Sequence, residues 1–156
     1  MAKDMQVVGF RVGRENFGVP IEFVHEIVRS MEVTTVPDSP DFIEGVINLR
    51  GKIIPVIDLR KRFGEKEITP NKKNRILVAE VAGKIVGLLV DTASEVIKIN
   101  PDDVEPPPNV FGENEVNYVT GVAKLKAKLV ILVDLERIMQ RGDLKRLGEL
   151  ATAAGA

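Results

Sequence analysis

Few side chains in this sequence could perform chemistry. There is one histidine, His25, and no cysteine, so neither a thiolate nucleophile nor a cysteine metal site is available. His25 lies in the pattern Val-His-Glu-Ile, whose alternation places it on the polar face of a strand. A lone histidine there, with no second histidine for a metal site, is a surface residue rather than a general base. We therefore expect no catalytic residue, no metal and no cofactor.

Two aspartates occupy equivalent places in two similar stretches, which suggests a pair of catalytic carboxylates. Asp58 and Asp134 each follow an apolar strand-like run and precede a helical pattern. A side-chain oxygen at that point accepts hydrogen bonds from the first N–H groups of the helix. We therefore interpret Asp58 and Asp134 as helix caps.

Basic residues gather at Arg60, Lys61 and Arg62 and recur in the polar segment that follows. Small barrels bind single-stranded nucleic acid with basic grooves and stacked aromatic side chains. Only Phe63 is near this cluster, and the chain carries a net charge of -1. A solvated helix and linker explain the cluster better, so no nucleic-acid partner is expected. A nucleic-acid-binding small barrel is the alternative from another functional class.

The composition is that of a soluble globular protein. Of the 156 residues, 44% are hydrophobic and 29% are charged, and the 22 basic and 23 acidic residues nearly cancel. No apolar run approaches the roughly 18 residues of a membrane span, and the N-terminus leads directly into a strand-like segment. We expect a cytoplasmic protein without direct membrane insertion.

The chain contains an internal duplication. Residues 6–28 match residues 75–97 without a gap, at an offset of 69 positions. Residues 45–59 match residues 121–135, at an offset of 76 positions. Glycine, acidic and apolar positions recur together, which indicates two copies of one unit rather than chance similarity between apolar runs.

Each unit is predicted to hold five short strands. Such units cannot bury much surface as open sheets, whereas closure removes their exposed edges. The predicted fold is all-β with short helices, with two small five-stranded SH3-like barrels side by side. The expected ranges within a single domain of residues 1–156 are sub-barrel 1 at 6–64, a linker at 65–74, sub-barrel 2 at 75–135 and a C-terminal helix at 135–150. Besides a hairpin at 45–59, strands are expected at 6–12, 16–21, 24–28, 75–81, 84–90, 93–99, 118–125 and 128–133.

The first unit contains a distinctive hairpin at residues 45–59, Gly-Val-Ile-Asn-Leu-Arg-Gly-Lys-Ile-Ile-Pro-Val-Ile-Asp-Leu. Apart from Asn48, Arg50, Lys52 and Asp58, its side chains are almost all apolar. Each of these polar residues either stabilises the local turn or is contacted by a partner. Glycines of the two units are expected to serve backbone geometry: Gly18, Gly45, Gly51 and Gly87.

This hairpin motif, with Phe17-Gly18-Val19 before it and Leu129 to Leu135 after it, closely resembles the CheW-like domain family. The similarity covers roughly residues 6–141. The resemblance implies a two-barrel fold without enzymatic activity. It also implies an adaptor that bridges transmembrane chemoreceptors to the CheA histidine kinase in bacterial chemotaxis. A coupling protein of a non-flagellar receptor array, such as one for pilus motility, is the alternative within the family.

The resemblance also implies two contact surfaces. The regulatory domain of the kinase would dock on the first barrel near Ile21 and Val24. The helical hairpin tip of the receptor would lie in the groove between the barrels, near Glu26, Arg50 and Val96. The protein would then be associated with membrane receptor arrays through its partners.

Arg50 allows two interpretations. Its planar guanidinium can hold a carboxylate or backbone carbonyls of a receptor helix in a fixed orientation. Alternatively, Arg50 pairs internally with Glu26 or Glu44 and only shapes the groove. The second unit has Ala123-Lys124-Leu125-Lys126-Ala127 in place of Ile-Asn-Leu-Arg-Gly, so the two barrels are not expected to bind one partner through identical contacts.

Overall fold

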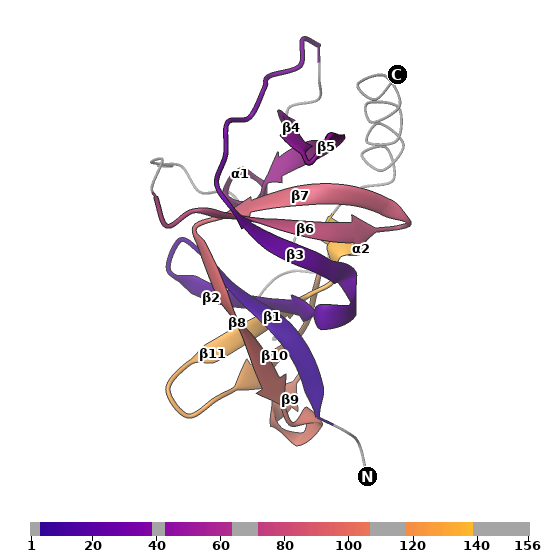
Figure 1. The fold of residues 1–156 in the computed structure, drawn as a ribbon. Coiled ribbons are helices and arrows are strands. Elements are labelled where there is room, and N and C mark those ends of the chain that lie inside the picture. Colours follow the sequence, from indigo (N-terminus) through magenta and orange to yellow (C-terminus); the bar gives the residue numbers. More distant parts are fainter. Residues whose placement is uncertain (1–3, 39–42, 64–71, 107–117, 139–156) are drawn as a thin grey trace.

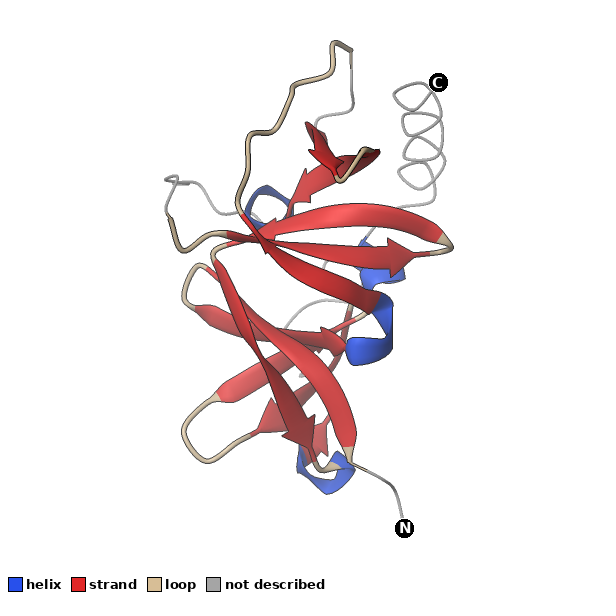
Figure 2. Ribbon diagram, in the orientation of Figure 1, coloured by secondary structure: helices blue, strands red, loops and turns tan. Residues whose placement is uncertain are grey.

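Strands make up most of the described chain (Figure 2). The computed structural model describes residues 4–38, 43–63, 72–106 and 118–138. Two short α-helices, α1 at Leu59–Arg62 and α2 at Leu135–Ile138, come after β5 and β11, and 3-10 turns lie at Ile21–Phe23 and Pro101–Asp103. The strands are β1 Met5–Val12, β2 Glu15–Pro20, β3 Val24–Arg29, β4 Ile43–Leu49, β5 Lys52–Asp58, β6 Arg75–Val81, β7 Lys84–Val90, β8 Thr92–Ile99, β9 Val104–Glu105, β10 Val119–Lys124 and β11 Leu129–Val133.

The predicted fold class is confirmed, because the strands form two barrel-like sheets with few short helices. One sheet has six strands in the order β8-β1-β2-β11-β10-β9, and the other has five in the order β3-β6-β7-β5-β4. Of the predicted C-terminal helix at 135–150, the described residues show α2 at Leu135–Ile138. Positions 139–150 of that prediction and 65–71 of the predicted linker lie outside the described residues.

The two sheets do not follow the predicted sub-barrel ranges 6–64 and 75–135. The β1–β2 hairpin of the first unit pairs with β8 and β11 of the second, and the β6–β7 hairpin of the second unit pairs with β3 and β5 of the first (Figure 1). Each barrel is therefore built from both units. The prediction assumed that the strands of each unit pair with one another. The β1–β2 and β6–β7 hairpins are equivalent and offer equivalent strand edges. In the structure each hairpin pairs with strands of the other unit, and we call this arrangement the exchanged pairing.

The exchanged pairing uses equivalent residues in the two barrels. In the parallel contact of β2 with β11, Gly18 lies opposite Leu132, and in that of β7 with β5, Gly87 lies opposite Val56. These pairs correspond under the offsets of the duplication. A Cβ on Gly87 would lie 2.9 Å from a methyl carbon of Ile76, and one on Gly18 would be 3.0 Å from its nearest neighbour. Both glycines therefore occupy crowded places where a side chain would push strands apart.

The five-stranded sheet closes between its edge strand β4 and the segment after β3. Thr34 and Val46 exchange two backbone hydrogen bonds, of 2.8 and 2.9 Å. Gly45 permits this approach, because a Cβ there would lie 2.3 Å from the Thr34 carbonyl oxygen, and its φ is 154°. Gly45 is therefore a backbone-geometry residue at the closure of the barrel.

The apolar core has a central cluster between the sheets and a smaller cluster within each barrel. Strand alternation divides neighbouring residues between them: Val56 belongs to the interior of the five-stranded barrel, whereas Ile57 belongs to the central cluster. Val7 and Val8 divide in the same way in the six-stranded barrel. Since the central cluster draws on both sheets, the two barrels share one core.

Four of the few aromatic side chains form one stack within the central cluster. Phe10, Phe17, Phe63 and Tyr118 follow one another with ring centroids 5.6, 4.8 and 5.2 Å apart. Phe63 lies between Phe17 and Tyr118. Phe63, the aromatic side chain next to the basic cluster in the sequence, is therefore used in packing and is not presented for stacking on a base.

Candidate functional site

The candidate site centres on the turn between β4 and β5. The Gly51 N–H donates a hydrogen bond of 2.9 Å to Asn48 Oδ1. Arg50 and Gly51 have φ values of 52° and 87°, the left-handed pair that joins strands through a two-residue turn. Asn48 is therefore a local turn device, and the turn leaves 67% of the Arg50 side chain exposed.

Arg50 reaches across the barrel closure to β3. Its Nη2 donates to Glu26 Oε2. Glu26 is on β3 and Arg50 is in the turn that follows β4, and these two strands lie at opposite ends of the strand order of the sheet. The hydrogen bond from Arg50 lowers the pKa of the Glu26 carboxyl, and Glu26 in turn raises the pKa of Arg50. Such an exposed pair adds little stability, but it sets the direction of the guanidinium.

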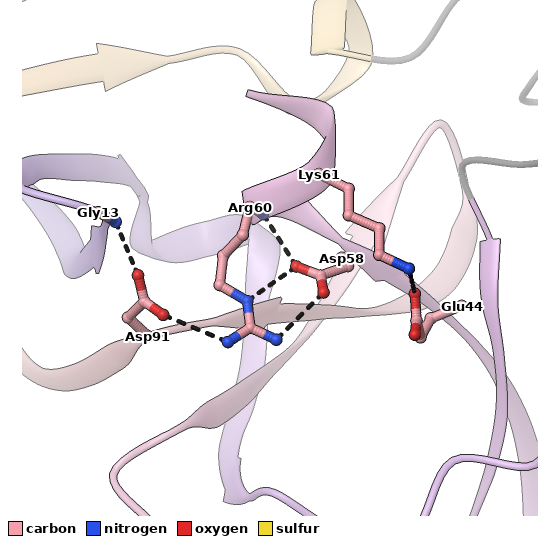
Figure 3. A network of polar contacts seen from close by, with 6 residues as sticks. All are labelled: Gly13, Glu44, Asp58, Arg60, Lys61 and Asp91. Carbon is pink, nitrogen blue, oxygen red and sulfur yellow. Dashed lines mark hydrogen bonds and ion pairs between the residues drawn. The ribbon is translucent and has the colours of Figure 1, made fainter. Parts of the chain in front are cut away.

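The other predicted internal partner of Arg50 is engaged elsewhere. Glu44 accepts a hydrogen bond of 2.7 Å from Lys61 Nζ (Figure 3). Of the two carboxylates considered for Arg50, the structure therefore selects Glu26. An exposed arginine that is oriented by one carboxylate still has N–H groups that point to solvent.

A cavity of about 380 Å³ lies beside the Glu26–Arg50 pair. Polar side chains border an apolar wall that includes Ile85, which is 36% exposed. Such a surface suits the apolar face of a helix whose polar groups reach the rim. The lining residues all belong to the five-stranded barrel: His25, Glu26, Leu49, Arg50, Lys52, Ile53, Ile54, Val78 and Ile85.

The other predicted contact residues lie apart from this cavity. Val96 is 53% exposed on β8 of the six-stranded sheet and does not line it. Ile21 and Val24 are half-buried at the 3-10 turn and the start of β3, where they pack against the central cluster. The structure thus brings Glu26 and Arg50 together, keeps Ile21 and Val24 beside each other at the 3-10 turn, and places Val96 on the other sheet.

Asp58 and Asp134 cap the two short helices. Asp58 Oδ1 accepts a hydrogen bond of 2.9 Å from the Arg60 N–H, and Asp134 Oδ1 accepts one of 2.9 Å from the Glu136 N–H. Asp58 is buried, whereas the Asp134 side chain is 36% exposed. The two caps therefore share their local geometry but differ in their surroundings.

One buried charged network is not apparent from the sequence, which predicts Arg60 on a solvated helix. The Arg60 side chain is only 6% exposed and holds Asp58 with two bonds, Nε–Oδ1 at 3.0 Å and Nη2–Oδ2 at 3.1 Å. Its Nη1 also reaches Asp91 Oδ1 at 3.3 Å, and Asp91 Oδ2 accepts a bond of 2.7 Å from the Gly13 N–H (Figure 3). The available signal was the Asp-Leu-Arg spacing directly after a buried strand.

We call Asp58, Arg60, Asp91 and the Gly13 N–H the Arg60 network. Burial lowers the pKa of Arg60, but bonds and charge from Asp58 and Asp91 outweigh that effect and raise it. Arg60 follows a strand of the five-stranded barrel, whereas Gly13 lies in the β1–β2 turn of the six-stranded one. The network therefore connects the two barrels with directional bonds in addition to the apolar core.

The described residues hold neither a cluster of metal-binding side chains nor a helix that could span a membrane. No group of three or more histidine, cysteine, aspartate or glutamate side chains in residues 4–38, 43–63, 72–106 and 118–138 is placed to hold a metal ion. Among the same residues, no helix has the length and apolar character needed to cross a membrane.

Comparison with known proteins identifies close relatives. The model of the CheW-like domain matches residues 6–143. The probable chemotaxis protein CheW of Rhizobium etli is 36% identical over 140 residues, which cover 90% of each chain. Chemotaxis protein CheW of Helicobacter pylori is 36% identical over 137 residues, covering 88% of this chain and 82% of the relative. The crystal structure of scaffolding protein TtCheW from Thermoanaerobacter tengcongensis aligns with a TM-score of 0.79 and 42% identity, covering 88% and 93% of the two chains.

Proposed function

Because this chain belongs to the CheW-like domain family, we propose that it is a non-enzymatic adaptor that couples transmembrane chemoreceptors to the CheA histidine kinase. The observation that carries the proposal is the match along nearly the whole chain to relatives named as chemotaxis proteins and to a structure titled a scaffolding protein. The adaptor works in the cytoplasm and reaches the membrane only through its partners.

The receptor contact is the cavity beside the Glu26–Arg50 pair. A receptor hairpin tip presents helices, and a helix can place an apolar side chain against Ile53 and Ile85 while its polar groups meet Arg50. Glu26 holds the guanidinium at the rim before the partner arrives, which reduces the ordering cost of binding. Val96 on β8 serves as a second, separate contact.

The kinase contact lies around the 3-10 turn at Ile21–Phe23. Ile21 and Val24 are half-buried, so their outer surfaces can be covered by a partner while their inner surfaces keep the core intact. Phe23 between them is 43% exposed and extends the apolar area. Aromatic side chains at the centre of an interface contribute strongly to binding.

The test is reconstitution with a receptor cytoplasmic fragment and CheA. We expect the wild-type protein to bind both and to raise kinase output in the ternary mixture. Arg50→Ala should weaken receptor coupling and leave binding to the CheA regulatory domain unchanged. Lys124→Ala is the matched control, since Lys124 is also an exposed cation in an exposed ion pair, with Glu105.

For the kinase surface, Val24→Glu should weaken CheA binding while receptor binding persists. Far-UV circular dichroism checks that the fold is retained. Normal coupling by Arg50→Ala would contradict the assignment of the receptor contact. Salt-sensitive binding of the wild-type protein to single-stranded DNA, without binding to CheA or receptor, would instead favour a nucleic-acid-binding barrel.

A further inference from the structure

The cavity beside the Glu26–Arg50 pair owes part of its rim to a β-bulge. Val24 and Glu26 pair with adjacent residues of β6, so His25 is an extra residue between them. In a regular strand, His25 and Glu26 would point to opposite faces of the sheet. A bulge bends its strand and redirects a side chain. Both residues line the cavity, so the bulge adds His25 to the same rim as the ion pair.

The duplication separates the features of this cavity that belong to the fold from those particular to the five-stranded barrel. An equivalent bulge lies in β8, at Ser94, so the bulge is common to both units but its side chain is not. Ile85 in the apolar wall corresponds to Asn16. Val78 corresponds to Gly9. Asn16 and Gly9 line a cavity of about 50 Å³, compared with about 380 Å³ in the five-stranded barrel. The large apolar cavity therefore depends on residues that only the five-stranded barrel has.

The rim of the cavity carries an excess of positive charge. Among the described residues that line it, the charged ones are Glu26, Arg50 and Lys52, which are two cations and one carboxylate. Arg50 donates to Glu26, and this bond balances part of the charge of both groups. Lys52, the first residue of β5, is exposed at the same rim. The charge of Lys52 is therefore available to a partner.

The apolar wall has a buried part and an accessible part. Ile54 and Val78 are buried in the interior of the five-stranded barrel. Ile53 is half-buried and Ile85 is 36% exposed, so a partner can cover both without disturbing the core. Side chains three or four positions apart on a helix project from one face. A helix that covers Ile53 and Ile85 can therefore place a second side chain at Lys52.

We propose that this cavity selects a partner helix on which a carboxylate lies one turn away from an apolar side chain. Lys52 binds the carboxylate, and an N–H of the His25 ring donates to a polar group of the same helix. A carboxylate at Arg50 would lie beside Glu26 and be repelled, whereas neutral carbonyl groups of the helix can accept from the remaining Arg50 N–H groups. A helix with a basic side chain in place of the carboxylate is repelled by Lys52.

This inference rests on the proposed function, because the helix is one of those at the receptor tip. It adds the chemistry that the receptor must present and the two residues that recognise it. The expected effect of each residue is modest, since exposed charge pairs and single hydrogen bonds are weak. Their value lies in discrimination between partners, because like charges in contact oppose binding.

The test is titration calorimetry of the full-length protein with a receptor cytoplasmic fragment at several salt concentrations. Lys52→Gln should weaken binding about two- to fivefold and Lys52→Glu about tenfold. Lys52→Gln should also make the affinity less sensitive to salt, which a change in packing alone would not do. Lys126→Glu is the matched control, since Lys126 is an exposed lysine of the equivalent hairpin in the six-stranded barrel, and it should change the affinity less than about twofold.

His25 is tested by a pair of variants. His25→Leu keeps an apolar body but removes the ring N–H groups, and it should weaken binding about two- to tenfold. His25→Asn keeps an N–H donor and should retain most of the affinity. Unchanged binding by His25→Leu would overturn the role of His25.

The outcomes separate this inference from the proposed function. Wild-type affinity of Lys52→Glu, or an equal loss in Lys126→Glu, would overturn the selection of a carboxylate and leave the proposed function in place. Failure of the wild-type protein to bind the receptor fragment would overturn the proposed receptor contact and this inference with it. Lys52→Glu should bind the CheA regulatory domain as the wild type does, and a loss of that binding would overturn the assignment of Lys52 to the receptor contact.

Discussion

Replacement of Arg60 by methionine tests whether the Arg60 network connects the two barrels energetically. Methionine keeps a similar length and apolar stem but removes the guanidinium. Asp58, which is 2% exposed, then loses both side-chain bonds and keeps only its cap bond to the backbone. Asp91 keeps its bond from the Gly13 N–H. The variant therefore leaves one buried carboxylate without its compensating charge.

The expected loss of stability follows from this burial. Removal of one partner of a buried ion pair costs roughly 3–5 kcal/mol, because the remaining charge stays desolvated. The lower end applies here, since the cap bond remains and the Asp91 side chain is 32% exposed. We expect about 3 kcal/mol, which lowers the thermal midpoint of a chain of this size by about 6–12 °C.

The assay is denaturant unfolding followed by far-UV circular dichroism, since the chain has no tryptophan to report by fluorescence. Lys61→Met is the matched control, because the neighbouring Lys61–Glu44 pair is exposed and should contribute no more than about 1 kcal/mol. Asp58→Asn with Arg60→Met should recover most of the loss, because the cap oxygen is kept and no charge is buried. A stability of Arg60→Met within about 0.5 kcal/mol of wild type would refute the reasoning.

Three further predictions follow from the geometry. Gly45→Ala should cost about 1–3 kcal/mol of unfolding free energy from backbone strain, and more from the clash with the Thr34 carbonyl oxygen. Gly83 also has a positive φ, of 79°, but no atom lies within 4 Å of the position of an added Cβ, so Gly83→Ala should lower the unfolding free energy by only about 1 kcal/mol. In carboxyl NMR titrations, Glu26 should titrate at lower pH in wild type than in Arg50→Ala, because Arg50 lowers its pKa. The Glu26–Arg50 ion pair is therefore kept at pH values above the usual pKa of glutamate, and it is lost as the pH falls through the lowered pKa of Glu26. Finally, circular dichroism and the near-ultraviolet signal of Tyr118 should report one coincident unfolding transition, since each barrel takes strands from both units; separate transitions would contradict a shared core.

Strand positions were predictable because their signals are local. The expected strands at 75–81 and 84–90 coincide with β6 and β7, and the hairpin at 45–59 contains β5 and all of β4 except its first two residues. Alternating β-branched residues bounded by glycine mark a strand whatever it pairs with. The caps at Asp58 and Asp134 were predictable for the same reason, since a cap depends on the next three residues.

Strand pairing was not predictable, because it depends on contacts distant along the chain. The two units share an apolar pattern, so β2 fits beside β5 or β11 equally well by pattern alone. Arg60 was misplaced for a related reason. It follows Asp58 by two residues, but its burial depends on Asp91 and on the turn at Gly13, which the chain brings there only through the exchanged pairing.

The reciprocal exchange explains how one duplicated unit can acquire two different surfaces without losing its fold. The crowded contacts at Gly18 and Gly87 are equivalent and must both be kept, because they set the parallel seams that join the units. The residues just after β5 and β11 are under no such constraint once one bonded network connects the barrels. Arg60 provides that network on one side, whereas its counterpart Glu136 is exposed. The two positions can therefore differ in charge and in exposure while both parallel seams are kept.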